Sequence, residues 1–498
     1  MGAQMNGSHL FLPYFQPKIR FMRLKLATFS DFANQLYPHE ADYLASIQNF
    51  SKGINSQIIN TIKFNSHNPQ KPRIFDPTID KRTYSYVKSW IVQSLDKADV
   101  DKFFEWLAYT EKQVILDSIT PDEEKEILSF IKTIGPSQYF FLRFYELLQY
   151  FRDYLLIRLR NRIYKPVNDY LQKHEAAYHH GMAINIQLNQ AAEEIIRQHE
   201  TLDAEPIHYS DFLKTTFSNP NLDGYTRYRA AVRLTFLYYN YREFENLRVV
   251  YDELDTLFKT DVFYSKRILA NYYSNRAMMH SKLNELGLAE QYGHLSIRQK
   301  NSDYLFYLAN LCGVLLRSGK YEKALKLMSS SIPELKKTSS FYNKIGFASF
   351  YTRTLVFNKM AKNAVSYAST FLDAYKKEIF ETRWHLFFSA YLQALLNAEN
   401  YSRLLSVAKR YNLLALEKKI IDKTVYMPLL LWYNEVALYM EGQQSKEKLV
   451  ETILSSARML LQNKYKAGRI YELLENLSDS IPSEVAVIRQ KLCEVQNN

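Results

Sequence analysis

From residue 224 onward, the sequence repeats itself at steps of roughly 35 to 42 residues. The clearest unit covers residues 304–337 and has small residues at Cys312, Ala324 and Ser331. Gly319 lies between the two halves of this unit, where a tight turn needs a backbone conformation that glycine adopts readily. Small residues let paired helices approach each other closely. The repeat therefore predicts an array of helix pairs.

Other segments share the same register. The small residues Ala277, Ala289 and Ser296 lie 35 residues before those of the clearest unit. Further positions of the pattern are filled by Ala231, Phe244, Leu247, Ala364, Ala368, Tyr401, Leu404 and Ala408, and a sixth pair is expected within residues 426–461. This pattern resembles the tetratricopeptide repeat (TPR), a helix-turn-helix unit of about 34 residues.

The resemblance implies an all-α protein, in which an N-terminal helical domain is followed by a TPR-like α-solenoid of about five to six helix pairs. We expect an N-terminal arm at residues 1–30, the helical domain at 31–200 and the solenoid at 225–498. The composition favours a helical fold, because the chain has only 13 Gly and 14 Pro residues, whereas folds rich in strands and turns normally contain more glycine.

Local signals place several helices before the repeats. The apolar period predicts helices over residues 31–50 and 99–116. Thr120 is followed by Pro121 and, three positions on, by Glu123, which together form the start signal known as a capping box. The apolar segment 426–440 contains Asn434 and Glu435, so we expect a buried helix there and no membrane span.

The chain is basic, with 64 Lys and Arg against 52 Asp and Glu. Residues 301–450 hold 21 basic and 12 acidic side chains, which is most of the net charge of +12. Such a surplus attracts acidic partners or phosphate backbones. A solvated, Lys-rich outer face is the simpler interpretation, and a nucleic-acid site remains the alternative.

No motif in the sequence indicates catalysis. There is no phosphate-binding P-loop, no GxSxG nucleophile elbow and no GxGxxG dinucleotide motif. Two distant cysteines, Cys312 and Cys493, make neither a disulfide framework nor a CxxC metal pair, and we expect Cys312 to be a small core residue. The sequence therefore predicts a non-enzymatic, cytoplasmic protein without a cofactor or a bound metal.

Two local clusters have an alternative functional interpretation. His174 and His179 flank a near-HExxH pattern, but they lie about 140° apart on a helix and cannot share one zinc ion. An enzyme site around His174, Glu175, His179 and His180 is the third-ranked alternative. The arginines at 152, 158, 160 and 162, with nearby aromatic residues, could bind single-stranded nucleic acid, although the aromatic spacing favours a helix core.

The TPR resemblance also implies a concave groove that binds peptides through the first helix of each unit. Transferred to this sequence, the groove positions carry amide or cationic side chains: Arg233, Asn240, Asn275, Lys282, Asn310, Arg317, Arg353, Gln393 and Asn397. An Asn side chain can bond both backbone groups of an extended peptide, and a Lys or Arg can pair with its carboxylates. Each of these residues has a solvated polar position as its structural alternative.

The leading hypothesis is a scaffold protein that binds an extended or acidic polypeptide in this groove. The alternatives are a regulatory nucleic-acid-binding protein that uses residues 301–450, and a peptide-sensing regulator with the solenoid as its sensor. The high tyrosine content, 39 residues, leaves self-association open.

Overall fold

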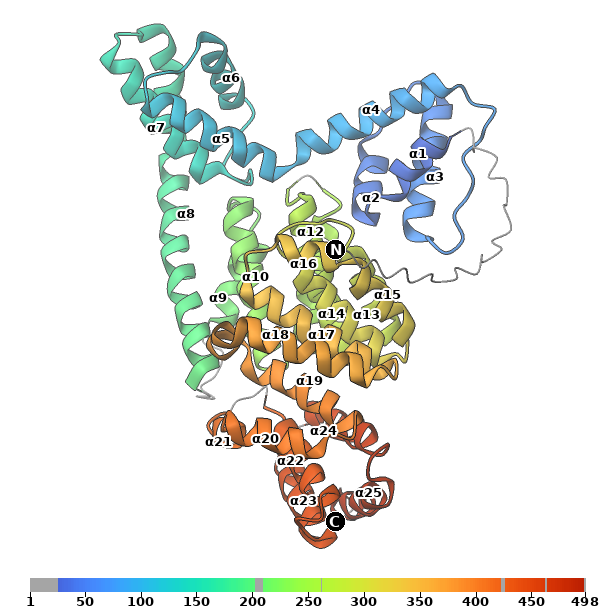
Figure 1. Cartoon of the computed structure of the whole chain (residues 1–498). Coiled ribbons are helices and arrows are strands. Elements are labelled where there is room, and N and C mark those ends of the chain that lie inside the picture. Colours follow the sequence, from blue (N-terminus) through green and yellow to red (C-terminus); the bar gives the residue numbers. More distant parts are fainter. Residues whose placement is uncertain (1–25, 202–208, 261, 422–425, 462–463, 497–498) are drawn as a thin grey trace, which may run out of the picture. The chain divides into compact units, whose positions relative to one another are not determined.

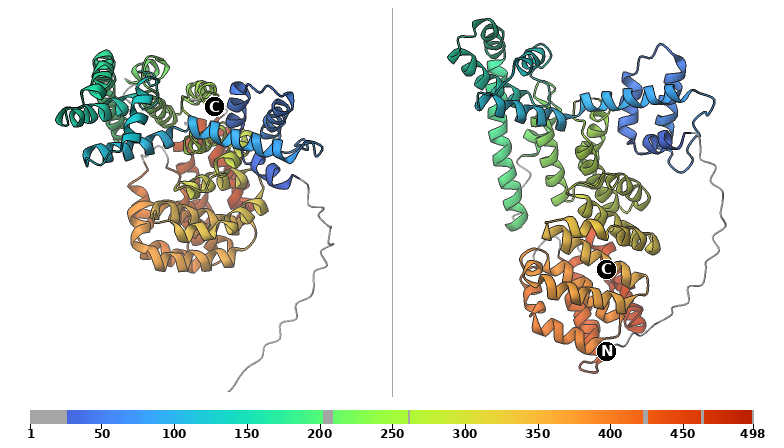
Figure 2. Two further views of the ribbon diagram at one scale, coloured as in Figure 1. Left: turned by 90° about the horizontal axis from the view of Figure 1, so that it is seen from above. Right: turned by 45° about the horizontal axis from the view of Figure 1, so that its top comes forward.

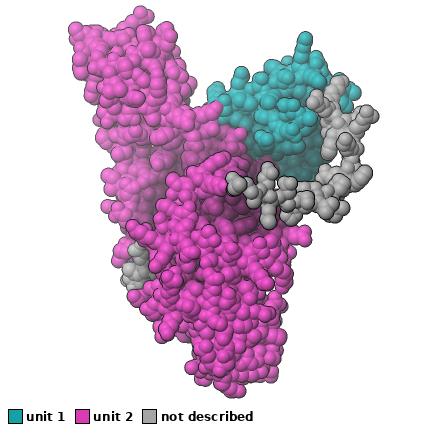
Figure 3. Space-filling view, viewed as in Figure 1, with its two compact units in different colours: residues 1–97 teal, residues 98–498 magenta. Residues whose placement is uncertain are grey.

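The computed structural model describes residues 26–201, 209–260, 262–421, 426–461 and 464–496. The described residues form 25 helices and no strand, which confirms the predicted all-α class. They divide into two compact units, residues 1–97 and residues 98–498, coloured separately in Figure 3. None of the described helices combines the length and the apolar character that crossing a bilayer requires.

The boundary between the two compact units, at residues 97 and 98, does not coincide with a segment boundary expected from the sequence. Most of the expected arm lies outside the described residues, and the first helix begins at Ala27. Within residues 98–498, helices α8 and α9 both pack against α10, so the expected division between 200 and 225 is not a gap between compact units. The division into a helical domain at 31–200 and a solenoid at 225–498 stays a prediction.

The first unit contains four helices: α1 (Ala27–Asn34), α2 (Pro38–Ile47), α3 (Gly53–His67) and α4 (Lys81–Ala98). The single helix predicted over 31–50 is wrong, because the chain breaks between α1 and α2. Pro38 starts α2 and cannot donate a hydrogen bond to α1. The Glu40 carboxylate instead accepts a hydrogen bond from the Tyr37 N–H at 2.8 Å and caps the new helix.

The second unit begins with α5 (Val100–Ile115), α6 (Pro121–Ile131), α7 (Phe141–Ile157), the long helix α8 (Asn161–Thr201) and α9 (Ser210–Ser218) (Figure 1). The predicted helix 99–116 corresponds to α5. The predicted capping box is confirmed: Thr120 N–H donates to Glu123 Oε2 at 2.6 Å, and Glu123 N–H donates to Thr120 Oγ1 at 3.4 Å.

Helix pairs follow one another through the rest of this unit, as Figure 2 shows from two sides. The pairs are α10 (Gly224–Asn240) with α11 (Phe244–Leu257), α12 (Lys266–Lys282) with α13 (Leu286–Ser296), α14 (Tyr304–Arg317) with α15 (Tyr321–Ser330), α17 (Phe341–Phe357) with α18 (Ala361–Thr382), α19 (Trp384–Asn397) with α20 (Tyr401–Arg410), α22 (Leu429–Met440) with α23 (Lys446–Leu461), and α24 (Lys464–Leu477) with α25 (Pro482–Gln496). Two short helices, α16 (Ile332–Lys337) and α21 (Leu413–Lys418), lie between pairs.

The first helices of successive pairs also pack on one another: α12 contacts α14, α14 contacts α17, α17 contacts α19, and α19 contacts α22. The small residues of the sequence pattern are buried within the packed helix pairs. Cys312 is 1 % exposed, and Ala324 and Ala364 are fully buried. The expectation that Cys312 is a core residue is confirmed.

Six turns between paired helices share one geometry. A residue in the left-handed region ends each first helix, with φ of 60° at Arg242, 62° at Asn284, 70° at Gly319, 60° at Lys359, 54° at Glu399 and 68° at Gly442. The next N–H bonds back five residues, as from Lys320 to the Leu315 carbonyl at 2.9 Å. This hydrogen bond is that of a Schellman motif, which satisfies carbonyl groups left open at a helix end. The predicted role of Gly319 is confirmed, and four of the six positions are not glycine.

Glycine is expected to stabilise the turn at Glu399, because the left-handed conformation costs a residue with a Cβ atom about 1–2 kcal/mol. We expect Glu399→Gly to raise the free energy of unfolding by about 0.5–1 kcal/mol after the entropy of glycine is subtracted. Glu451→Gly, at an exposed position inside α23, is the matched control and should lower it by about 1 kcal/mol. Chemical denaturation measures both, and equal losses would contradict the turn argument.

Candidate functional site

Four cationic side chains and one carboxylate lie within electrostatic reach of one another on α24 and on the first helices of three pairs. We call this set the basic cluster: Lys282 of α12, Arg317 of α14, Arg353 of α17, and Arg469 and Glu472 of α24. Arg317 and Arg469 both bond to Glu472. Arg469 is also close enough to lower the pKa values of Lys282 and Arg353. The cluster thus has a surplus of three positive charges.

Lys282 is the exposed cation of the cluster. Surrounding protein, followed by the positive charges of Arg469, Arg242 and Arg317, lowers its pKa to about 8. The lowered pKa shows that the amine is partly desolvated. The Lys282 side chain is nevertheless exposed, so a ligand can reach it. Lys282 forms no ion pair with any described residue, so its charge is available to a partner.

Arg353 is half-buried and has no carboxylate partner among the described residues. Its Nη2 donates to Ser389 Oγ at 2.7 Å, while its Nε is buried without a hydrogen bond. Burial lowers the pKa of Arg353 below its usual value. A partly desolvated cation without a counter-ion is unfavourable, and an acidic ligand would supply the missing negative charge.

Arg317 is held on several sides. Its Nε and Nη2 donate to Glu472 Oε1 at 3.0 and 2.9 Å, and its Nη1 donates to the Ser281 carbonyl at 2.6 Å. Arg469 bonds to the other oxygen of Glu472. Burial raises the pKa of Glu472, but the guanidinium groups of Arg469 and Arg317 outweigh it and hold that pKa below the usual range. Glu472 is therefore an anion near neutral pH.

The structure brings together three of the nine predicted groove residues, Lys282, Arg317 and Arg353. The others are placed elsewhere. Arg233 donates to the Leu188 carbonyl of α8, Asn275 donates to Asn271, Asn310 donates to Ser274, Asn397 donates to the Gln393 carbonyl, Gln393 is buried, and Asn240 is half-buried at the end of α10. The amides of Asn275, Asn310 and Asn397 are thus used within the fold. The ligand-binding role of all nine residues stays a prediction.

Three hydrogen bonds join successive first helices at a constant sequence offset of 36 residues. They are Asn310 to Ser274 at 3.2 Å, Arg317 to Ser281 Oγ at 2.9 Å, and Arg353 to Ser389 at 2.7 Å. Polar positions assigned to a ligand thus also align neighbouring pairs. A substitution that removes one of these side chains therefore disturbs packing as well as charge.

Sequence reasoning missed Arg469 and Glu472, because residues 451–498 carry equal numbers of basic and acidic side chains. The available signal was the two-sided character of α24. Its buried residues are Ile470, Leu473, Leu474 and Leu477, whereas Arg469 and Glu472 lie three positions apart on the other face. Pairing them with α14, more than 150 residues away, needed the three-dimensional fold.

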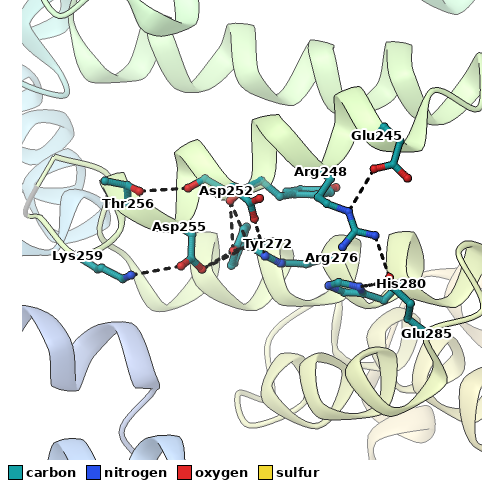
Figure 4. Close-up of polar contacts among 11 residues, drawn as sticks. Glu245, Arg248, Asp252, Asp255, Thr256, Lys259, Tyr272, Arg276, His280 and Glu285 are labelled. Atoms are coloured by element: carbon teal, nitrogen blue, oxygen red, sulfur yellow. Dashed lines mark hydrogen bonds and ion pairs between the residues drawn. The ribbon is translucent and has the colours of Figure 1, made fainter.

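A second polar network, shown in Figure 4, pairs each of its arginines with carboxylates and has no surplus of positive charge to attract an acidic partner. Arg276 of α12 pairs with Asp252 and Asp255 of α11, at 2.7 and 3.4 Å. Arg248 pairs with Glu285 at 2.9 Å, and the buried His280 contacts Glu285 at 2.5 Å. Burial lowers the pKa of His280. This network holds α11, α12 and the start of α13 together.

The structure places the residues of the two alternative clusters on α7, on α8 and in the turn between them, several of them beside acidic side chains. His179 lies 3.9 Å from Glu175 on an exposed face of α8, and no group of three metal-binding side chains occurs among the described residues. Three of the arginines pair with acids: Arg152 with Asp153, Arg158 with Asp117, and Arg160 with Glu124. Phe151 is fully buried, as expected for a core residue.

We compared the chain with models of known families, with curated proteins and with solved structures. None of the three comparisons found a match.

Proposed function

We propose that the chain is a non-enzymatic interaction protein that binds an extended, acidic polypeptide at the basic cluster. In this proposal, residues 225–498 form a TPR-like solenoid, with the seven helix pairs described above in place of the five to six expected from the sequence. The protein works in the cytoplasm. The observation that carries the proposal is that the basic cluster contains four cations and one carboxylate, a surplus of three positive charges. Within a protein, such an excess is stable chiefly when a partner supplies negative charge.

The distribution of the cations supports an extended partner. Lys282, Arg317 and Arg353 belong to three successive first helices, so a ligand that meets all three must run across the pairs. Carboxylate side chains spaced along a peptide fit such a row, and guanidinium groups bind carboxylates through paired hydrogen bonds. The free thiols of Cys312 and Cys493 agree with a reducing compartment.

A nucleic-acid ligand is less favoured, because acidic residues already engage several lysines around the basic region. Glu290 pairs with Lys320 at 2.5 Å and with Lys323 at 2.6 Å. Glu334 pairs with Lys300 at 3.0 Å and with Lys337 at 3.3 Å. Glu290, which lies outside residues 301–450, thus offsets part of the charge surplus of that segment, and Glu334 occupies one of its lysines. A peptide-sensing regulator would bind its peptide at the same cluster. It would differ from a scaffold in changing its activity when the peptide binds, and not in the binding itself.

The test is direct binding of fluorescent probes to the full chain, followed by anisotropy. A short Glu-rich peptide is expected to bind, and a Lys-rich peptide of equal length is not. A single-stranded RNA of similar charge serves as the comparison. Preference for RNA over the acidic peptide, or equal binding of both peptides, would overturn the proposal.

Binding should also depend on pH with a defined sign. Lys282 loses its proton as the pH rises through about 8, and a neutral amine no longer attracts an anion. Between pH of about 7 and about 9.5 we expect the affinity for the acidic peptide to fall about fivefold to tenfold. Lys282→Gln should bind weakly at both pH values and show a flat profile. An equally steep profile in that variant would remove Lys282 from the site.

A further inference from the structure

The carboxylate of Glu472 already occupies part of the basic cluster. Its Oε1 accepts two hydrogen bonds from Arg317, at 3.0 and 2.9 Å, and its Oε2 accepts one from Arg469. Both oxygens are therefore bound by guanidinium groups, which is how a carboxylate of an acidic ligand would be held. The fold supplies from its own chain the chemical group that the cluster selects.

Arg317 has no simple way to bind a second carboxylate while Glu472 stays in place. Its Nη1 is bonded to the Ser281 carbonyl at 2.6 Å and to Ser281 Oγ at 2.9 Å. Its Nη2 is also bonded to Asn284 Oδ1 at 3.2 Å. Each nitrogen of the guanidinium group therefore already donates a hydrogen bond. A ligand carboxylate must replace Glu472 to use Arg317 fully.

Glu472 can leave without unfolding α24. The apolar side chains Ile470, Leu473 and Leu474 hold the helix in the core, with at most 5 % of their surface exposed. The Glu472 side chain lies on the opposite side and is 35 % exposed. A rotation about its side-chain bonds moves the carboxylate toward solvent. The exchange thus costs two ion pairs and no core contact.

We propose that Glu472 competes with a carboxylate of the ligand for Arg317 and Arg469, so that the cluster is partly closed to weakly acidic partners. This inference rests on the proposed function and deepens it, because it names the anchoring group and its competitor. Among the described residues, neither Lys282 nor Arg353 is paired with a carboxylate, and the exposed Lys282 makes the first contact with the ligand. Arg317 and Arg469 then respond only to a ligand whose carboxylates displace Glu472.

The test is Glu472→Gln, which keeps the shape of the side chain and removes its charge. The surplus of the cluster rises from three positive charges to four, and both guanidinium groups lose their internal anion. We expect the Glu-rich peptide to bind about tenfold more tightly. Glu475→Gln is the matched control, since Glu475 lies on the same helix, pairs only with Arg489 among the described residues and is 66 % exposed. It should leave the affinity unchanged.

The outcomes separate this inference from the proposed function. If the native protein binds the acidic peptide and Glu472→Gln binds it equally well, the competition is overturned and the function stands. If neither protein binds the peptide, the function and the inference both fail. A gain in Glu472→Gln for RNA alone would contradict the carboxylate as anchoring group. Thermal unfolding of both variants shows whether each is compared in its folded state.

Discussion

Replacing Lys282 by Glu is expected to weaken binding of the acidic peptide about 30- to 100-fold. The change removes an exposed cation and places an anion in the path of the ligand, and close like charges at an interface cost several kcal/mol. Folding should not suffer, because Arg469 and Arg317, which lower the pKa of Lys282, would attract the new carboxylate. Fluorescence anisotropy at constant salt measures the effect.

The matched control is Lys336→Glu on α16, which makes the same change in net charge at an exposed position without an ion pair among the described residues. It should shift the affinity less than about twofold, through the long-range field alone. A loss in Lys336→Glu as large as that in Lys282→Glu would show that binding follows net charge and not the basic cluster.

Phe388→Ala should lower the free energy of unfolding by about 3–5 kcal/mol. Phe388 is fully buried in α19, and its ring lies 5.3 Å from that of Phe380 and 5.4 Å from that of Tyr411, measured between centroids. Truncation leaves a cavity between three helices that the surrounding rings cannot fill. Chemical denaturation followed by circular dichroism measures the loss.

Phe236→Ala on α10 removes the same atoms from a side chain that is 60 % exposed. The control variant should therefore change stability by less than about 1 kcal/mol. A similar loss in both variants would contradict the assignment of Phe388 to the core. A small loss in both would mean that the helix pairs relax around the missing ring.

Much of the helical architecture could be predicted because its signals are local. The capping box at Thr120, the turn at Gly319 and the small residues such as Cys312 each follow from neighbours in the chain. The break at Pro38 was missed, since the apolar period continues across it. Local patterns thus indicate most helices but not every interruption.

The candidate site could be predicted only in part, because ion pairs between distant segments leave no periodic trace in one sequence. Lys282, Arg317 and Arg353 were found through the repeat register. The register gave no reason to expect that Glu472 forms an ion pair with Arg317, or that the Asn310 amide donates a hydrogen bond to Ser274. Which polar side chains are available to a partner is a property of the packed structure.

The shared turn geometry makes the length of the helix array a functional variable. Each turn is closed by hydrogen bonds within a few residues, so an added or lost helix pair would leave the remaining joints intact. The meeting of Glu472 with Arg317, 155 positions earlier, is different. This contact requires the pairs between α14 and α24 to bring the two helices together. The number of pairs therefore determines whether Glu472 reaches Arg317. One pair more or fewer would carry the internal acid away from its arginine and leave that cation open to solvent.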